Sequence, residues 1–497
     1  MTEPCDLTAV EARTLIGQKT LSPVELLESC IARIEAVDHA VNAMVARDFD
    51  RARAQAKAAE AAVARGEQLP LLHGLPMGVK DLEETEGLRT TSGSPIFRDH
   101  VPAQDDIHVA QLRKAGAIVV GKTNVPEFGA GANSRNTVYG TTGNPFDTTK
   151  NAAGSSGGSA VALATNMVPI ATGSDTGGSL RNPASFNGVV GFRCSQGLVP
   201  SARRPIGFST NGVLGPMGRN VADTALMMAA MASDDSRDPM ATAVFGKKVH
   251  EPTDFWPVKP IDLSALRAAF SVDLGFAPVE RIVADAFTDK TARFRGVFGR
   301  SEDADPDMNG ADRAFEVGRA VGFLGRFRKW YAERPQDLGP NIRANVEEGM
   351  RYSLADWAEA HIEQTRIYRA FQDFFTRFDV LITPAITTSP RSWRELYPAE
   401  IDGKPTRTYF HWLALAYGVT LTGHPAIAIP CGLDRLGMPF GLQVVGPRGG
   451  DAFVLRVAAA LERRFAEDQA LARPVPDIAK LKAAPPIAEM PEFKGWG

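Results

Sequence analysis

The chain has 497 residues, of which 44% are hydrophobic and 23% charged, and this composition is ordinary for a folded globular protein. Its formal net charge of −3 provides no field that would attract nucleic acid or anionic lipid, and no run of Lys and Arg forms a binding strip. Composition therefore argues against nucleic-acid and membrane partners and favours a small molecule. At this length we expect one large domain with an inserted lobe, or two domains.

Four scattered cysteines, Cys5, Cys30, Cys194 and Cys431, include no CxxC pair, and the histidines form no cluster at metal-ligand spacing. We therefore expect no metal and a reducing, cytoplasmic location. The first six residues carry acids where a signal peptide needs basic residues, which disfavours secretion. Two long uncharged stretches, residues 152–174 and 408–433, are broken by Gly and Pro, so we expect buried core there and no membrane span.

The chain opens with helix signals. Ser22-Pro23-Val24-Glu25 is a capping box with proline at the first helical position, and apolar residues recur after it at helical spacing. An Ala-, Arg- and Glu-rich run over residues 48–66 predicts a second helix, which Gly66 to Pro70 ends. Residues 1–70 are thus predicted to form helices that pack on a core.

The pattern of apolar residues changes over residues 71–232. Short apolar runs at 75–79, 117–120 and 168–171 alternate with helix-like stretches and Gly-rich turns. Strands buried on both faces and separated by helices are typical of an α/β fold. We expect a mixed, mostly parallel sheet with helices on both faces, extending through a helix that begins near residues 221–223.

Residues 233–377 are charged, dotted with aromatic residues and mainly helical in character, which predicts an inserted lobe beside the substrate pocket. Strand signals return at 380–382, 426–429 and 442–445, and a helix over 454–461 closes the core segment 378–473. The Pro-rich tail, 474–497, fits a loosely packed arm or a contact with a neighbouring protomer, and we favour the arm.

Three motifs carry chemistry. In the first, Lys80 ends the apolar run of Gly74-Leu75-Pro76-Met77-Gly78-Val79-Lys80-Asp81. Most lysines are solvated surface charges, but an apolar lead-in favours burial, which lowers the pKa of the amine. A neutral lysine can act as a base.

The second motif is the loop Gly154-Ser155-Ser156-Gly157-Gly158-Ser159. It lacks the lysine of a phosphate-binding P-loop, and the apolar stretch after it argues against a flexible linker. The third is Gly173-Ser174-Asp175-Thr176-Gly177-Gly178-Ser179-Leu180-Arg181. Two glycines before a serine leave consecutive N–H groups uncovered, which suits an oxyanion hole beside its own nucleophile.

The third motif is not the GxSxG elbow, because Arg181 stands two residues after Ser179. No histidine sits in a triad motif, although a Ser-His-Asp triad is recognised by geometry and can be hidden in sequence.

Together these motifs resemble the amidase signature family, densely over residues 71–231 and more loosely over 378–464. Ser179 follows Ser155 by 24 residues and Ser155 follows Lys80 by 75, which is similar to the family's Ser-Ser-Lys spacing. The resemblance implies Ser179 as nucleophile, Ser155, after a cis peptide bond, as relay, and Lys80 as base.

The resemblance further implies an oxyanion hole made by backbone N–H groups of Thr176, Gly177, Gly178 and Ser179. Asp175 and Arg181 would form a hydrogen-bonded brace, and Ser156 would support the loop. Two departures from the family pattern, Ser174 in place of Thr and Phe192-Arg193-Cys194 in place of a Leu-Lys-Pro-like run, are expected not to touch the triad.

The implied activity is hydrolysis of a small-molecule carboxamide to a carboxylate and an amine or ammonia, extending to esters or carbamates, with no cofactor. The alternative within the resemblance is the glutaminase subunit of a tRNA-dependent amidotransferase, which passes ammonia to a partner. An inactive binding scaffold is the alternative of another class. For the oligomeric state, a homodimer is the default expectation.

Overall fold

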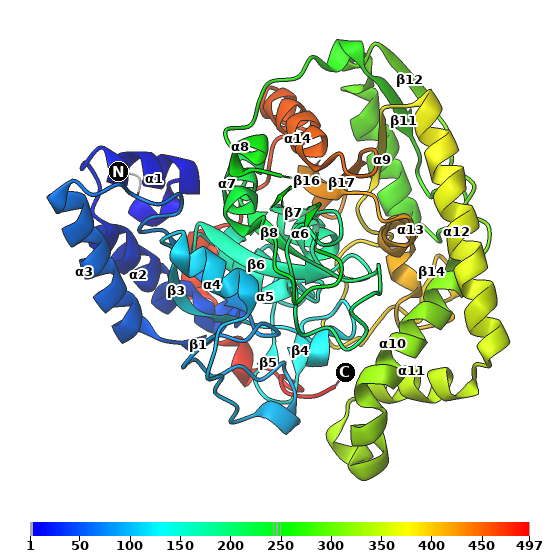
Figure 1. The fold of residues 1–497 in the computed structure, drawn as a ribbon, viewed down its shortest axis with the longest axis horizontal. Coiled ribbons are helices and arrows are strands. Elements are labelled where there is room, and N and C mark those ends of the chain that lie inside the picture. The colour runs from blue at the N-terminus through cyan, green and yellow to red at the C-terminus, as the bar shows by residue number, and fades with distance from the viewer. Residues whose placement is uncertain (1–2, 242, 245–246, 249, 497) are drawn as a thin grey trace.

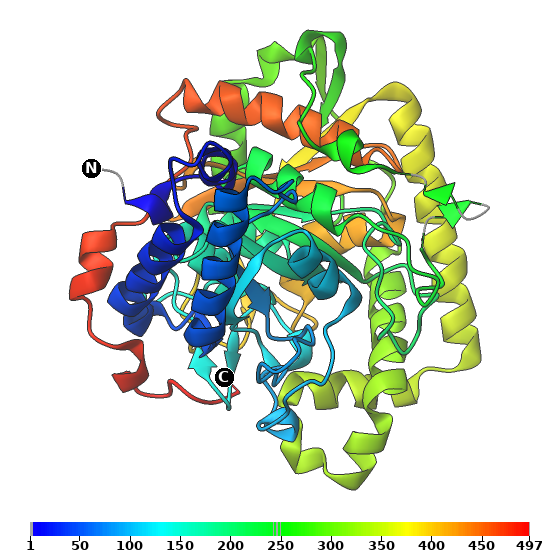
Figure 2. The ribbon, with the colours of Figure 1, turned by 60° about the vertical axis from the view of Figure 1, so that its left-hand side comes forward.

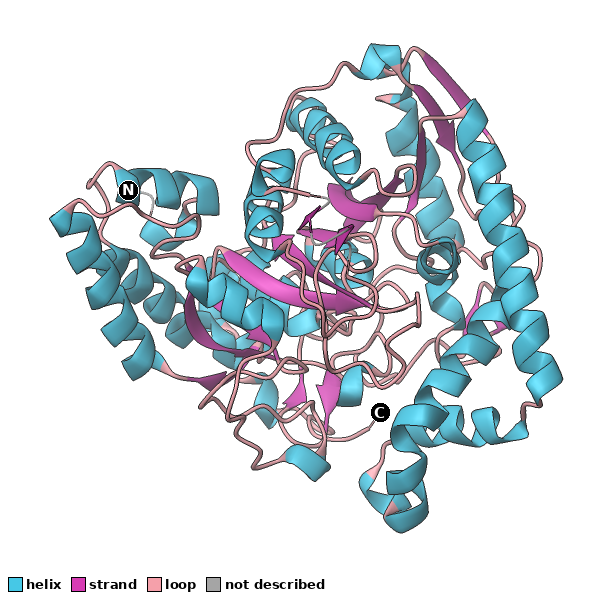
Figure 3. Ribbon diagram, in the orientation of Figure 1, coloured by secondary structure: helices cyan, strands magenta, loops and turns pink. Residues whose placement is uncertain are grey.

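The computed structural model describes residues 3–241, 243–244, 247–248 and 250–496. An eleven-stranded mixed sheet runs through it, with helices on both faces (Figures 1 and 3). In spatial order the strands are β1 (Met44–Arg47), β3 (Ile118–Thr123), β2 (Pro76–Lys80), β6 (Ile170–Asp175), β8 (Val213–Gly218), β7 (Val190–Arg193), β16 (Ala426–Leu433), β17 (Pro439–Val445), β13 (Val380–Pro384), β11 (Arg267–Phe270) and β12 (Arg300–Asp303). The predicted α/β class is confirmed.

Parallel pairing occurs in two blocks of the sheet, β3-β2-β6 and β13-β11-β12. The neighbours between the blocks, and β1 at the edge, pair antiparallel. Residues 434–438 alone connect β16 to β17, and a connection this short permits only an antiparallel hairpin. The parallel character expected from the buried apolar runs is therefore concentrated in these two blocks.

Side chains alternate between the two faces of the sheet, so neighbouring residues of β16 enter different cores. Ile427 and Ile429 lie in the hydrophobic cluster with helices α7 (Val221–Met231) and α14 (Asp451–Ala466). Ala428 lies in the cluster with α5 (Gly157–Ala164) and with Ala184 of α6 (Arg181–Asn187). The helices α5 and α6 begin within the two serine-containing motifs, so both motifs lie on the same face of the sheet.

The N-terminal helices are α1 (Ala9–Gly17), α2 (Pro23–Val41) and α3 (Phe49–Arg65), and they flank the β1 edge (Figure 2). The expected capping box is present at α2. The Ser22 hydroxyl accepts a hydrogen bond from the N–H of Val24, and the Glu25 carboxylate accepts one from the N–H of Ser22. Helix α4 (Ile107–Lys114) precedes β3.

The segment 233–377 supplies β11 and β12 to the sheet edge in addition to its helices α8 (Pro252–Phe255), α9 (Arg281–Ala292), α10 (Ala311–Glu333), α11 (Pro340–Arg351) and α12 (Leu354–Arg377). Helix α10 packs on α11, on α12 and on α13 (Ala414–Thr422), and α12 also packs on α13. Three two-stranded ribbons complete the described fold: β4 (Arg135–Asn136) with β5 (Gly140–Thr141), β9 (Ala243–Val244) with β10 (Lys247–Lys248), and β14 (Glu400–Ile401) with β15 (Lys404–Pro405). The division of the chain into five segments stays a prediction.

The C-terminal tail is docked on the core, so the expected loosely packed arm is wrong. Its helix α15 (Ile478–Ala483) packs on α2, and the side chains of Leu481 and Ile487 are only 2% and 1% exposed. Figure 2 shows the tail passing beside the N-terminal helices. Apolar residues spaced among the prolines supply the burial that holds this segment down.

Candidate active site

Lys80 is the last residue of β2, and its side chain is 0% exposed. Its Nζ lies 2.9 Å from the Oγ of Ser155, 2.8 Å from that of Ser156 and 2.9 Å from that of Ser174. No carboxylate lies within 4 Å of this nitrogen among the described residues. The amine is thus surrounded by hydroxyl groups and has no direct counter-ion.

Burial lowers the pKa of Lys80 from its ordinary 10.5 to about 7, because water no longer solvates the ammonium. The charges of Glu83 and Asp175 raise the pKa, but by less than burial lowers it. At neutral pH a large share of Lys80 is therefore the free amine, which can accept a proton.

Ser155 reaches Lys80 from the loop before α5. The Gly154–Ser155 peptide bond is cis, and the Ser155 side chain is 2% exposed. The following N–H, that of Ser156, donates to the carbonyl oxygen of Ser179 at 3.2 Å. This hydrogen bond joins the Ser155 loop to the Ser179 turn, although the two motifs are separate in sequence.

Ser179 lies in the turn between β6 and α6, and its side chain is partly exposed. The N–H of Gly178 donates to Asp175 Oδ1 at 2.9 Å. The N–H groups of Thr176, Gly177 and Ser179 have no hydrogen-bond partner among the described residues. These three groups remain available to an oxyanion, whereas the Gly178 N–H, which was expected to join them, is occupied by the carboxylate.

Asp175 holds this turn through a buried charge cluster. Arg181 donates to both of its carboxylate oxygens, at 2.8 and 3.0 Å, and Arg193 donates to one of them at 3.2 Å. Burial by itself would raise the pKa of the Asp175 carboxyl. The charges of Arg181 and Arg193 and the hydrogen bonds of Arg181 outweigh burial and hold the pKa well below its usual range.

Both sequence departures lie near these residues, and the expectation that neither touches the triad was wrong for Ser174, which contacts Lys80 directly. Arg193 contacts Asp175 and not the triad. The missed signal for Ser174 was strand alternation: Thr172 and Ser174 share one face of β6, and the Thr172 hydroxyl also accepts from the backbone N–H of Lys80 at 2.9 Å.

Two aromatic side chains, Phe315 and Tyr417, pack beside the turn that contains Ser179. A Cβ placed on Gly177 would lie 3.2 Å from Cζ of Phe315 on α10. The Phe315 ring stacks on Tyr417 of α13 at a centroid distance of 4.4 Å, and the Tyr417 hydroxyl donates to Asp312 at 2.5 Å. The buried rings of Phe315 and Tyr417 therefore pack beside Gly177.

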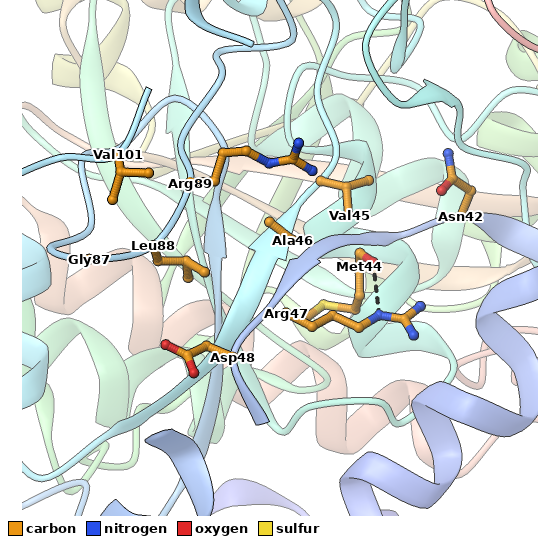
Figure 4. A pocket seen from close by; sticks show the side chains of 10 residues that line it. All are labelled: Asn42, Met44, Val45, Ala46, Arg47, Asp48, Gly87, Leu88, Arg89 and Val101. Atoms are coloured by element: carbon orange, nitrogen blue, oxygen red, sulfur yellow. Dashed lines mark hydrogen bonds between the residues drawn. The ribbon is translucent and has the colours of Figure 1, made fainter. Parts of the chain in front are cut away.

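A cavity of about 750 Å³ lies elsewhere, at the β1 edge (Figure 4). Its walls include Met44, Arg47, Asp48, Leu88, Arg89 and Val101, and none of the predicted site residues lines it. It is therefore separate from the candidate active site.

Within the described part of the chain, one group of potential metal ligands lies close together: Glu3, Cys5 and Asp6. Both carboxylates are already paired with Arg33. None of the described helices is long and apolar enough to cross a membrane.

The sequence profile of the family described as Amidase matches residues 25–455. The chain belongs to the amidase signature family. An acylamidase of Rhodococcus erythropolis is 32% identical over 462 residues, covering 92% of this chain and 95% of that protein. One subunit of the Glutamyl-tRNA(Gln) amidotransferase from a Picosynechococcus species is 34% identical over 489 residues, covering 92% and 98%.

Among solved structures, a bacterial aryl acylamidase of the amidase signature family superposes with a TM-score of 0.84 at 27% identity, covering 92% of this chain and 96% of that one. The chain is thus similar both to acylamidases and to a subunit of an amidotransferase.

Proposed function

We propose that this amidase signature protein hydrolyses a small-molecule carboxamide through a seryl acyl-enzyme. Ser179 is the nucleophile, Ser155 the relay and Lys80 the base. The observation that carries the proposal is the 2.9 Å contact between Ser155 Oγ and the fully buried Lys80 Nζ, whose pKa is about 7. A buried amine near half ionisation is poised to accept and return a proton.

In the acylation step the lone pair of neutral Lys80 takes the proton of the Ser155 hydroxyl, and Ser155 takes that of Ser179. Ser179 Oγ then bonds to the carbonyl carbon, and the carbonyl π electrons move to oxygen. The N–H groups of Thr176, Gly177 and Ser179 would donate to this oxyanion. Each such donor is worth about 3 kcal/mol in comparable hydrolases.

The tetrahedral intermediate collapses when the C–N bond breaks and Ser155 gives its proton to the leaving nitrogen, while Ser155 is reprotonated by Lys80. An amide requires this proton because an amine anion leaves poorly. Water then adds to the acyl-enzyme with the same relay and releases the carboxylate. Every proton is supplied by the three side chains and water, so this route requires no metal or organic cofactor.

Ser156 and Ser174 have a supporting part in this proposal. An ammonium donates three hydrogen bonds, whereas a neutral amine donates two and offers one lone pair. If Ser156 and Ser174 accept the two donated bonds, the lone pair of Lys80 is left facing Ser155. The hydroxyls of Ser156 and Ser174 therefore orient the base toward the relay.

The central test is substitution of Ser179 by Ala, which should abolish both turnover of a neutral anilide and labelling by a fluorophosphonate probe. Ser155→Ala should reduce turnover strongly. Ser159→Ala is the matched control, because its hydroxyl bonds Thr172 and Thr123 at 2.9 and 2.7 Å in the same motif but not Lys80. Full activity in the Ser179→Ala variant would refute the proposal.

The second candidate is the glutaminase role, which the 34% identity to an amidotransferase subunit favours. We place a free-standing enzyme first because the atoms nearest a Cβ built on Gly177 are apolar atoms of Phe315 and Tyr417. Ammonia release from glutamine together with co-purification of a stable partner protein would reverse this order. We also propose a cytoplasmic location, consistent with four buried free cysteines, and leave the homodimer as a prediction.

A further inference from the structure

Helix α10 connects the two ends of the catalytic centre. At one end Phe315 faces Gly177, where an added Cβ would lie 3.2 Å from the ring. At the other end Phe327 contacts the ring of Phe128 at a centroid distance of 4.9 Å. The next residue, Gly129, approaches Ser155 so closely that an added Cβ would lie 3.2 Å from its Oγ. The helix therefore passes beside both the nucleophile turn and the relay loop.

Arg319 occupies the middle of this span, one turn after Phe315 on the same side of α10. Its side chain is 8% exposed. Nε donates to the hydroxyl of Tyr409 at 3.0 Å, Nη2 donates to the same oxygen, and the guanidinium lies over the rings of Phe323 and Phe410, 4.6 and 5.2 Å from their centroids.

This guanidinium has no acidic partner. No carboxylate of the described residues lies within 4 Å of it, and its Nη1 has no hydrogen-bond partner among them. The acids nearest in sequence are engaged elsewhere: Asp312 and Glu316 both pair with Arg407. A largely buried cation without a counter-ion is costly, because burial removes most of its hydration and only the Tyr409 hydroxyl and the aromatic rings replace it.

The surroundings of Arg319 contain further unmatched polarity and free space. Asn345 of α11 donates to the Tyr409 hydroxyl at 2.8 Å, while its own Oδ1 is buried without a partner among the described residues. An added Cβ on Gly322, three residues after Arg319, would meet nothing within 4 Å. Arg319 and Asn345 thus each keep a polar atom without a partner among the described residues, and the space beside Gly322 on the same helix is open.

We propose that Arg319 binds a carboxylate of the substrate, so that the enzyme selects amides that carry an acidic group apart from the scissile bond. This inference rests on the proposed function. A guanidinium and a carboxylate are both planar and can form two parallel hydrogen bonds. The Tyr409 hydroxyl accepts from Nε and Nη2 of Arg319, so Nη1 remains for the ligand. One helical turn separates Arg319 from Phe315, about 6 Å along α10, so a ring or a few methylenes would join carboxylate and amide.

Two matched substrate pairs test this specificity on either side of the scissile bond. In the first pair, N-phenylsuccinamic acid carries a carboxylate on the acyl side of the amide, and its methyl-ketone analogue N-phenyl-4-oxopentanamide is the neutral member. In the second pair, 4-acetamidobenzoate carries the carboxylate on the amine side, and 4-acetamidoacetophenone is the neutral member. In at least one pair the acidic member should have a kcat/KM about tenfold or more above that of the neutral member.

Arg319→Met should lower kcat/KM of the favoured acidic substrate about 100-fold and that of its neutral partner less than threefold. Arg319→Lys, which keeps the charge, should retain part of the preference. Arg328→Met, which removes an exposed charge from the same helix, should leave the ratio unchanged.

Equal loss on both members of each pair in Arg319→Met, or no preference for either acid by the wild-type enzyme, would overturn the inference. The comparison of acidic and neutral substrates with the wild-type enzyme tests the inference even if Arg319→Met fails to fold. Failure of the proposed function would look different, because the neutral anilides would then not be hydrolysed and Ser179 would not be labelled.

Discussion

The pH dependence of kcat/KM is the sharpest consequence of a buried Lys80. With a pKa of about 7, Lys80 is neutral at pH 7 in about half of the molecules. A lysine with the ordinary pKa of 10.5 is neutral in only about one molecule in 3,000. Below pH 7 the amine binds a proton and can no longer accept one from Ser155. The rate should therefore fall about tenfold per pH unit, to about 1% of its plateau at pH 5, and should be level from pH 8 to 9.

Hydrolysis of a neutral chromogenic anilide, 4-nitroacetanilide, from pH 5 to 9 at constant ionic strength measures this profile. Glu83→Gln should move its midpoint to lower pH, because the charge of Glu83 raises the pKa of Lys80. Glu127 is the control, since burial raises its pKa to about 7 as well. Glu127→Gln should leave the midpoint in place. A flat profile, or a midpoint that follows Glu127 and ignores Glu83, would refute the reasoning.

Three further outcomes are expected. Ser174→Ala should lower kcat about tenfold by removing one hydroxyl from Lys80, and Ser174→Thr should restore most of it in the same assay; equal losses would contradict a polar role. Asp175→Asn should lower the free energy of unfolding by about 3–5 kcal/mol in urea titration, since it leaves two buried guanidinium groups unpaired. Gly129→Ala should reduce kcat/KM much more than Gly66→Ala, because the φ angles are matched at 73° and 72° but only the first methyl meets Leu82 and Ser155; similar activity in the two variants would argue against these contacts.

The prediction of strands was reliable where a single pattern sufficed. The runs at 75–79, 117–120, 168–171, 380–382, 426–429 and 442–445 correspond to β2, β3, β6, β13, β16 and β17. Each is a continuous apolar segment buried on both faces, so its signal is contained in the segment itself. The four-residue strands β11 and β12, at one end of the sheet, were missed within a helical region, because strands this short carry little pattern of their own.

The sequence by itself determined which residues the proposed function uses: a lysine ending an apolar run, and serines in two glycine-rich motifs at a defined spacing. These are local signals, because burial tendency and glycine content are properties of short segments. The tertiary structure decided which of them meet. Ser174 and Lys80 are 94 residues apart, Arg181 and Gln443 are 262 apart, and the docked tail joins the last residues to the first helices.

The order of strands in the sheet brings such distant residues together, and no local pattern encodes that order. The same reason explains Arg319, whose sequence is that of an ordinary charged helix. Only the packing of α10 between the Ser179 turn and the Gly129 loop makes it a buried cation beside the catalytic centre.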